Sequence, residues 1–175
     1  YLYRFWQRLP EAGTLAVFDR SWYGRVLVER VEKLTDEAAW RRAYDEINEF
    51  EHLLIDDGVR LVKLFLHITP DEQLTRFRER LEVPYKRWKL TPDDIRNRRR
   101  WPDYERAIDD MLDRTSTKAA PWHVVPANYK WYARIKAMTI ITETLGDGVD
   151  LAPPPLDPKI AAAMTEYNPT EDWQP

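Results

Sequence analysis

The 175-residue sequence contains no cysteine and only five glycines, and each shortage excludes a class of site. Without cysteine the chain can form neither a disulfide nor a thiolate metal centre, which fits a reducing compartment. No stretch matches the glycine-rich phosphate loop G-x-x-x-x-G-K-[ST]. No apolar run is long enough to cross a bilayer, and residues 1–8 lack the apolar core of a signal peptide. We therefore expect a cytoplasmic protein without a membrane partner.

The formal net charge of −3 argues against a nucleic-acid partner, but the charge is unevenly distributed. Between Arg76 and Arg100 there are ten basic and four acidic residues, a local charge of +6 that leaves −9 for the remainder. A basic block on an acidic body indicates a polyanionic ligand bound at one place. The ordinary alternative is a solvated helix face. We favour the ligand, because the helical face that carries Arg96, Arg99 and Arg100 is expected to lack balancing acids.

Hydrophobic periodicity predicts an α/β fold in which strands alternate with helices. Such alternation is typical of a parallel sheet with helices on both faces. The last helix is expected to turn Trp131, Ile135 and Met138 inward. The expected strands are Leu15–Phe18, Val59–Ile68 and Trp122–Val125. The expected helices are 1–9, 23–34, 36–56, 70–83, 92–100, 102–114 and 128–145.

The basic block is mostly helical and lies between the second and third expected strands, so we interpret it as a lid at about 82–101. Capping boxes are predicted at T-P-D-E from Thr69 and T-P-D-D from Thr91, with proline at the first helical position of each helix. Residues 1–150 are expected to form the core, and the proline-rich residues 151–175 an extended tail.

The first expected strand ends at Asp19, and Arg20, Ser21 and Arg25 follow closely. The carboxyl ends of parallel strands form the ligand-binding edge of an open α/β sheet, where an acid typically holds Mg²⁺ in phosphate-handling folds. One guanidinium group can donate two parallel hydrogen bonds to phosphate oxygens, so Arg20 and Arg25 are suited to bind a phosphoryl group. The alternative is a simple strand-to-helix turn with Asp19 or Ser21 as N-cap.

Four stretches, in the same order, resemble the family-2 polyphosphate kinases. They are F-D-R-S-W-Y-G-R-V-L-V-E-R-V-E from Phe18, P-Y-K-R-W-K-L from Pro84, R-W-P-D-Y-E-R-A-I-D-D-M-L from Arg100, and T-S-T-K-A-A-P-W-H-V-V-P-A-N from Thr115. The resemblance implies a P-loop kinase fold of the thymidylate kinase-like type. It also implies Mg²⁺-dependent phosphate transfer between inorganic polyphosphate and a nucleoside mono- or diphosphate. The ending G-R-V-L-V-E-R is most similar to members that act on AMP, and ADP is the other possible acceptor.

The resemblance also assigns roles to single residues. Asp19 matches the Walker B acid of the family and would hold Mg²⁺, and with Arg20 and Arg25 it forms the expected catalytic set. Many members carry Asp where this chain has Tyr129. The Walker A segment of the family lies upstream of a stretch like residues 1–10, so the sequence resembles the C-terminal part of a longer protein and is expected to be inactive alone. The expected polyphosphate-binding residues are Arg4, Lys86, Lys89, Arg96, Arg98, Arg99 and Arg100.

Two other functions stay open at this point. One is an ATP-dependent nucleoside or nucleotide kinase of the thymidylate kinase type, and the other is a non-catalytic polyphosphate- or nucleotide-binding module. We also expect a homo-oligomer. In related P-loop kinases a further strand lies between those that match Leu15–Phe18 and Val59–Ile68. Without it two strand edges stay unpaired, so the 175-residue chain is not expected to form the sheet of the family unaided.

Overall fold

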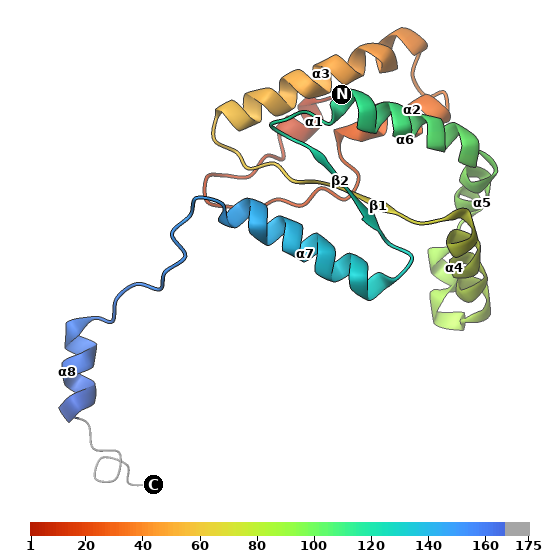
Figure 1. The fold of residues 1–175 in the computed structure, drawn as a ribbon. Helices are drawn as coiled ribbons and strands as arrows, with labels where there is room; N and C mark the ends of the chain where they lie inside the picture. Colours follow the sequence, from red (N-terminus) through yellow and green to blue (C-terminus); the bar gives the residue numbers. More distant parts are fainter. Residues whose placement is uncertain (167–175) are drawn as a thin grey trace. The chain divides into compact units, whose positions relative to one another are not determined.

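The structure is a computed structural model that describes residues 1–166 (Figure 1). The chain divides into two compact units, Tyr1–Thr144 and the residues from Leu145 onward. None of the helices within residues 1–166 combines the length and the apolar character needed to cross a membrane. The elements are α1 (Tyr3–Trp6), the 3-10 helix η1 (Trp22–Arg25), α2 (Val28–Val31), α3 (Glu37–Asp56), β1 (Lys63–His67), α4 (Pro70–Glu82), the 3-10 helix η2 (Pro84–Lys89), α5 (Pro92–Arg99), α6 (Trp101–Thr115), β2 (Trp122–Pro126), α7 (Lys130–Gly146) and α8 (Pro158–Glu166).

Strands β1 and β2 form a two-stranded parallel sheet, which confirms the predicted parallel α/β arrangement (Figure 1). Lys63 is paired with Trp122, and the register continues to His67 opposite Pro126. Parallel neighbours require a long crossover connection, and here α4, η2, α5 and α6 supply it.

Helices cover both faces of this sheet, as the alternating pattern predicted. On one face Phe65 and Trp122 pack against a core built from η1, α3 and Met111 of α6. On the other face Leu64 and Val125 pack against Ala133 and Ile140 of α7. Because successive residues of a strand point to opposite faces, β1 joins the two cores.

Local signals place the starts of the long helices correctly. The Asp36 carboxylate accepts a hydrogen bond from the Ala39 amide at 2.7 Å, which caps α3. Thr91 and Asp94 form a full capping box at α5. At α4 the Thr69 hydroxyl accepts from the Glu72 amide at 3.3 Å. The side chain of Glu72 instead binds Arg76, so the box predicted there is only half formed.

The predicted strand Leu15–Phe18 is wrong. The segment belongs to neither strand of the sheet, and Leu15 and Val17 are 59% and 83% exposed. No strand within residues 1–166 lies beside this segment, so its backbone groups have no ladder in which to pair. The predicted helix 23–34 is also interrupted, because the backbone of Leu27 leaves the helical region between η1 and α2.

The predicted inward face of α7 is wrong as well. Trp131, Ile135 and Met138 are 64%, 66% and 57% exposed, whereas Ala133 and Ile140 are buried against the sheet. Helix α7 is apolar on both sides, so periodicity alone could not select the face that is buried.

The tail is partly as expected. Residues 151–157 form neither helix nor strand, but α8 makes the next nine residues helical, contrary to the expectation of an extended tail. Residues 167–175 lie outside the described part of the chain. The division between core and tail at residue 150, like the lid at about 82–101, stays a prediction.

Candidate functional site

The turn at Asp19, Arg20 and Ser21 follows residues 15–18 and carries the central candidate residues. Asp19 and Arg20 are exposed. Arg20 has a φ of 67°, a left-handed conformation that non-glycine residues adopt uncommonly and at a cost. On one side the Phe18 ring packs 5.6 Å from the ring of Trp22 and 6.0 Å from that of Phe5. The turn is therefore strained and is fixed to the core on both sides.

This turn borders a groove with a volume of about 780 Å³. Arg20 and Ser21 line the groove together with residues 64–68, from β1 and the position after it, and with Trp122 and Val124 of β2. The groove thus follows the sheet and reaches the carboxyl end of β1, the edge at which ligands bind in open α/β sheets. Polar side chains from α4, α5 and α6 complete the lining, namely Gln73, Asn97, Tyr104, Glu105 and Asp109.

Three of the predicted cations, Arg20, Arg96 and Arg100, act electrostatically on Tyr104 of α6. Burial raises the pKa of the Tyr104 hydroxyl and the negative charge of Glu32 raises it further, while Arg100, Arg96 and Arg20 act in the opposite direction. Arg20 and Tyr104 both line the groove, whereas Arg96 and Arg100 of the basic block are not among its lining residues.

The basic block is not free of balancing acids, so that expectation is wrong. Arg96 pairs with Asp93 at 2.7 Å and with Glu32 at 3.1 Å. Arg100 lies 3.5 Å from the same Glu32 and donates to the Val31 carbonyl at 2.6 Å. The two arginines therefore share one carboxylate on α2.

Other members of the block are separated from this cluster. Lys86 pairs with Glu79, and the ammonium of Lys89 lies 5.2 Å from the ring centroid of Trp88. Arg98 donates to the Pro70 carbonyl and to Gln73, at 2.7 and 3.0 Å. Arg99 is exposed and, within residues 1–166, makes no hydrogen bond or ion pair. The seven predicted polyphosphate-binding residues are thus not gathered at one point.

Arg25 and Arg4 meet at Glu29 rather than at the turn. Arg25 lies 3.0 Å from Glu29 and donates to the Thr35 hydroxyl at 2.8 Å, with its guanidinium over the Tyr1 ring. Arg4 reaches Glu29 at 3.4 Å. These contacts tie the N-terminal residues to α2, and the predicted roles of both arginines at a phosphate stay predictions.

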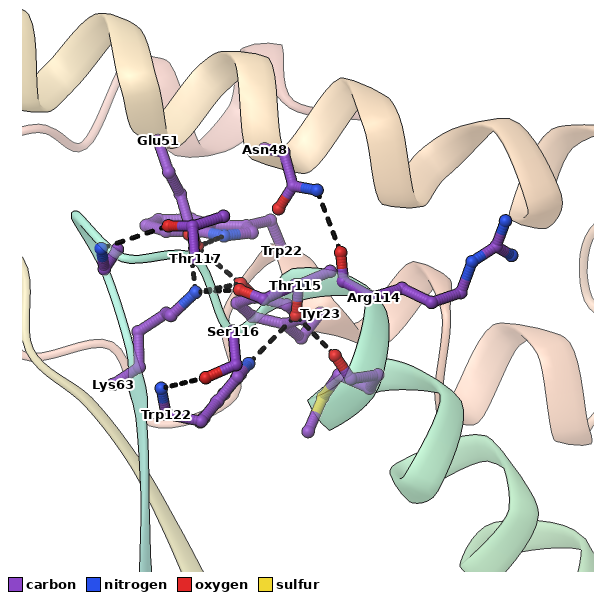
Figure 2. A network of polar contacts seen from close by, with 12 residues as sticks. Trp22, Tyr23, Asn48, Glu51, Lys63, Arg114, Thr115, Ser116, Thr117 and Trp122 are labelled. Atoms are coloured by element: carbon purple, nitrogen blue, oxygen red, sulfur yellow. Dashed lines mark hydrogen bonds and ion pairs between the residues drawn. The ribbon is translucent and has the colours of Figure 1, made fainter.

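Reasoning from the sequence missed a buried polar cluster, which Figure 2 shows below α3. Glu51 and Lys63 are 1% and 4% exposed, and their charged groups are 2.7 Å apart. The Glu51 carboxylate also accepts from Trp22 at 3.0 Å and from the Tyr23 hydroxyl at 2.6 Å. Lys63 further donates to Tyr23 at 3.0 Å and to the Thr115 carbonyl at 2.6 Å.

The signal for this cluster lies in the two elements that bury it. Lys63 interrupts the otherwise apolar end of V-R-L-V-K-L-F-L-H-I, and Glu51 lies on α3 beside the buried Ile47 and Leu54. A charged residue at a core position of each element suggests a pair. Burial lowers the pKa of the Lys63 ammonium against the opposing effect of Glu51, whereas burial and Glu51 raise the pKa of Tyr23.

A magnesium site has to rely on few protein ligands here. Residues 1–166 contain no group of three or more carboxylate or imidazole side chains that could hold a metal ion. Mg²⁺ is commonly held by one or two carboxylates together with phosphate oxygens and water. Asp19 is exposed, and within the described residues its carboxylate forms no ion pair, so its chemistry fits such an ion.

Comparison with known proteins gives consistent matches. Residues 1–149 match the family model described as polyphosphate kinase 2. The polyphosphate:AMP phosphotransferase of Pseudomonas syringae pv. tomato is 54% identical over 145 residues, which are 83% of this chain and 29% of that protein. The AMP/ADP-polyphosphate phosphotransferase of Meiothermus ruber is 45% identical over 145 residues, 83% of this chain and 54% of that protein.

A solved structure extends the match to three dimensions. The crystal structure of polyphosphate kinase 2 from Arthrobacter aurescens TC1 superposes with a TM-score of 0.84 at 41% identity, covering 94% of this chain and 59% of that one. The chain thus spans only 29% of the first of these relatives and 54% of the second. The fold is that of these kinases, and the chain belongs to the polyphosphate kinase 2 family.

Proposed function

We propose that this chain carries the Walker B turn and the lid of an enzyme that transfers a phosphate between inorganic polyphosphate and a nucleotide, most readily from polyphosphate to AMP. The observation that carries the proposal is the strained Asp19–Arg20 turn, whose Arg20 lines a groove together with residues of α4, α5 and α6. The names of the relatives support the same chemistry, since one is a polyphosphate:AMP and another an AMP/ADP-polyphosphate phosphotransferase. ADP is the second acceptor that we consider.

The residues divide the work of phosphoryl transfer, which is mainly positioning and charge stabilisation. Asp19 would hold Mg²⁺, which when bound neutralises charge on the phosphate oxygens. Arg20 is exposed at the groove and supplies paired donors to a phosphate. Arg96 and Arg100 have further N–H donors beyond those used by Glu32, so we assign them to the polyphosphate chain.

The remaining predicted residues are assigned to the polyphosphate chain away from the transferred group. Arg99 is exposed and free to bind an anion, and Lys86, Lys89 and Arg98 lie along α4, η2 and α5. For Arg25 and Arg4, a role at a phosphate requires exchange of their contacts with Glu29.

The choice of phosphate donor tests the proposal against its alternatives. The protein at its full natural length is incubated with AMP and Mg²⁺, with either long-chain polyphosphate or ATP, and the nucleotides are separated by chromatography. ADP formed from polyphosphate is the expected result. ADP formed from ATP alone indicates a nucleotide kinase of the thymidylate kinase type. Binding of polyphosphate without turnover indicates a non-catalytic module.

Asp19→Asn tests the metal role directly. A lost charge contact that strengthens in the transition state commonly costs on the order of 100-fold in turnover, and we expect at least that. Asp45→Asn on α3 is the matched control, because Asp45 is exposed and outside the groove. Equal turnover of the two variants across a range of Mg²⁺ concentrations contradicts the role of Asp19.

We also propose that the protein is cytoplasmic, where nucleotides are plentiful, and that it is a homo-oligomer. The exposed apolar side chains of α7, Trp131, Ile135 and Met138, support self-association, since exposed apolar patches commonly mark interfaces. Light scattering of the purified protein measures the oligomeric state, and a monomer at all concentrations contradicts this part of the proposal.

A further inference from the structure

The buried cluster around Glu51 and Lys63 is chemically complete. The Lys63 ammonium has three N–H donors, and it uses them on Glu51, Tyr23 and the Thr115 carbonyl. The Tyr23 hydroxyl donates to Glu51 and accepts from Lys63. Charges cancel within the pair and every donor has a partner, which is the condition under which a buried polar network rigidifies its surroundings.

The cluster holds the chain immediately after the Asp19–Arg20 turn. One carboxylate oxygen of Glu51 accepts both the Trp22 indole N–H and the Tyr23 hydroxyl, at 3.0 and 2.6 Å. These two residues begin η1, whose first backbone hydrogen bond runs from the Gly24 amide to the Ser21 carbonyl at 3.1 Å. The C-terminal side of the turn is therefore fixed to α3 and β1 through buried side chains (Figure 2).

The N-terminal side of the turn reaches the same anchor. The Phe18 ring lies 5.6 Å from the Trp22 ring, and Trp22 is only 3% exposed. Arg20 between them has a φ of 67°, and a conformation of this kind persists only where the surroundings impose it. Within residues 1–166 neither Asp19 nor Arg20 makes a hydrogen bond of its own, so the flanking anchors determine the conformation of the turn.

The cluster also reaches the opposite wall of the groove. Thr115 is the last residue of α6, and its hydroxyl donates to the Met111 carbonyl at 2.6 Å and accepts from the Trp122 indole at 2.9 Å. Helix α6 carries Tyr104 and Asp109, which line the groove. The same buried groups thus connect the turn, the sheet and the helix that faces the turn.

We infer that Glu51, Lys63 and Tyr23 act as positioning residues, which hold the Asp19–Arg20 turn in its strained conformation at the groove. Glu51 and Lys63 do not line the groove, and Tyr23, which does, commits its hydroxyl to the buried cluster. The inference rests on the proposed function for its effect on turnover, but the local order of η1 can be measured without it. Loss of one anchor should relax the turn and displace both the carboxylate and the guanidinium, and a displacement of about 1 Å can cost on the order of 100-fold in rate.

Tyr23→Phe is the test variant, because it removes one hydroxyl and keeps the ring that packs on Trp122 at 4.7 Å. Tyr44→Phe is the matched control. Tyr44 is fully buried on α3, belongs to the same core, and its hydroxyl accepts one hydrogen bond from Arg30 at 2.8 Å without contact to the turn. Trp22→Phe, which removes the indole donor, replaces the test variant if Tyr23→Phe does not fold.

All variants are measured in the protein at its full natural length, well below their melting temperatures. For Tyr23→Phe we expect kcat with polyphosphate and AMP to fall about tenfold or more, with a higher half-saturating Mg²⁺ concentration and little change in KM for polyphosphate. Amide hydrogen exchange at Gly24 and Val26 should accelerate, since their hydrogen bonds define η1. Tyr44→Phe should change neither turnover nor this exchange.

The outcomes separate the inference from the function on which it rests. If Tyr23→Phe and Tyr44→Phe behave alike in turnover and in exchange, the cluster is only a part of the core and the inference is overturned. If the unmodified protein transfers no phosphate from polyphosphate, the proposed function is wrong. The exchange comparison at Gly24 and Val26 then decides the inference alone, with equal rates in both variants as the overturning result.

Discussion

Replacing Lys63 with methionine removes the positive charge that faces Glu51 and keeps most of the apolar stem. Glu51 is 1% exposed and then has no counter-charge, although Trp22 and Tyr23 still donate to it. Breaking a buried pair from one side typically costs about 3–5 kcal/mol. A domain has about 5–15 kcal/mol of stability in total, so Lys63→Met should remove a large share of it.

A second substitution makes this reasoning testable. In Lys63→Met combined with Glu51→Gln, the buried charge is gone, while the glutamine oxygen can still accept from Trp22 and Tyr23. The double variant should therefore be more stable than the single one, although it carries one change more. Urea unfolding followed by circular dichroism gives the free energies. A loss below about 1 kcal/mol for Lys63→Met, or a double variant less stable than the single one, would refute the argument.

Three further predictions follow from the contacts described above. The pKa of Tyr23 is raised in the folded state, so the contribution of this hydroxyl to stability is complete below the unfolded pKa of 10.0 and is lost as the pH rises above it. Tyr23→Phe should therefore reduce the loss of stability between about pH 9 and about pH 11, which urea unfolding at alkaline pH measures. Amides of residues 15–18 should exchange quickly in the isolated chain and those of the β1–β2 ladder slowly, and equal protection in a monomer would contradict the unpaired segment. Arg99→Ala should weaken polyphosphate binding in a salt-dependent manner without loss of stability. Arg100→Ala should lower both polyphosphate binding and stability, because Arg100 also donates to the Val31 carbonyl. Identical melting temperatures of the two variants would contradict this distinction.

Local chemistry made part of this fold predictable. Thr69 and Thr91 mark predicted helix starts because a cap needs only residues within one turn, and the structure confirms both caps. Strands β1 and β2 were also found, since each is a short apolar run bounded by turn residues. The parallel order followed because helices separate the two runs.

The failures concern partners that a local pattern does not specify. Leu15–Phe18 has the composition of a strand, but a strand exists only where a neighbour accepts its hydrogen bonds, and the described residues offer none there. Helix α7 has large apolar residues on one side and Ala133 and Ile140 on the other, so the buried side is decided by the shape of the sheet. Asp19 and Arg20 could be proposed from the sequence because they lie together in one motif. Glu51 and Lys63 could not, because they meet only through tertiary packing.

The acids that pair with the basic block reduce the repulsion among its cations. Like charges at close spacing repel, and pairing Arg96 and Arg100 with Glu32, and Lys86 with Glu79, limits that repulsion while the helices fold. Arg96 and its partner Asp93 are 52% and 67% exposed, and ion pairs between exposed side chains contribute little to stability. A phosphate that carries more than one negative charge can therefore replace Asp93 at Arg96 at little cost, whereas the side chain of Glu32 is only 11% exposed. The acids on this face are thus compatible with a polyanion site, because they balance the charge of the basic block and leave Arg96 able to exchange a partner.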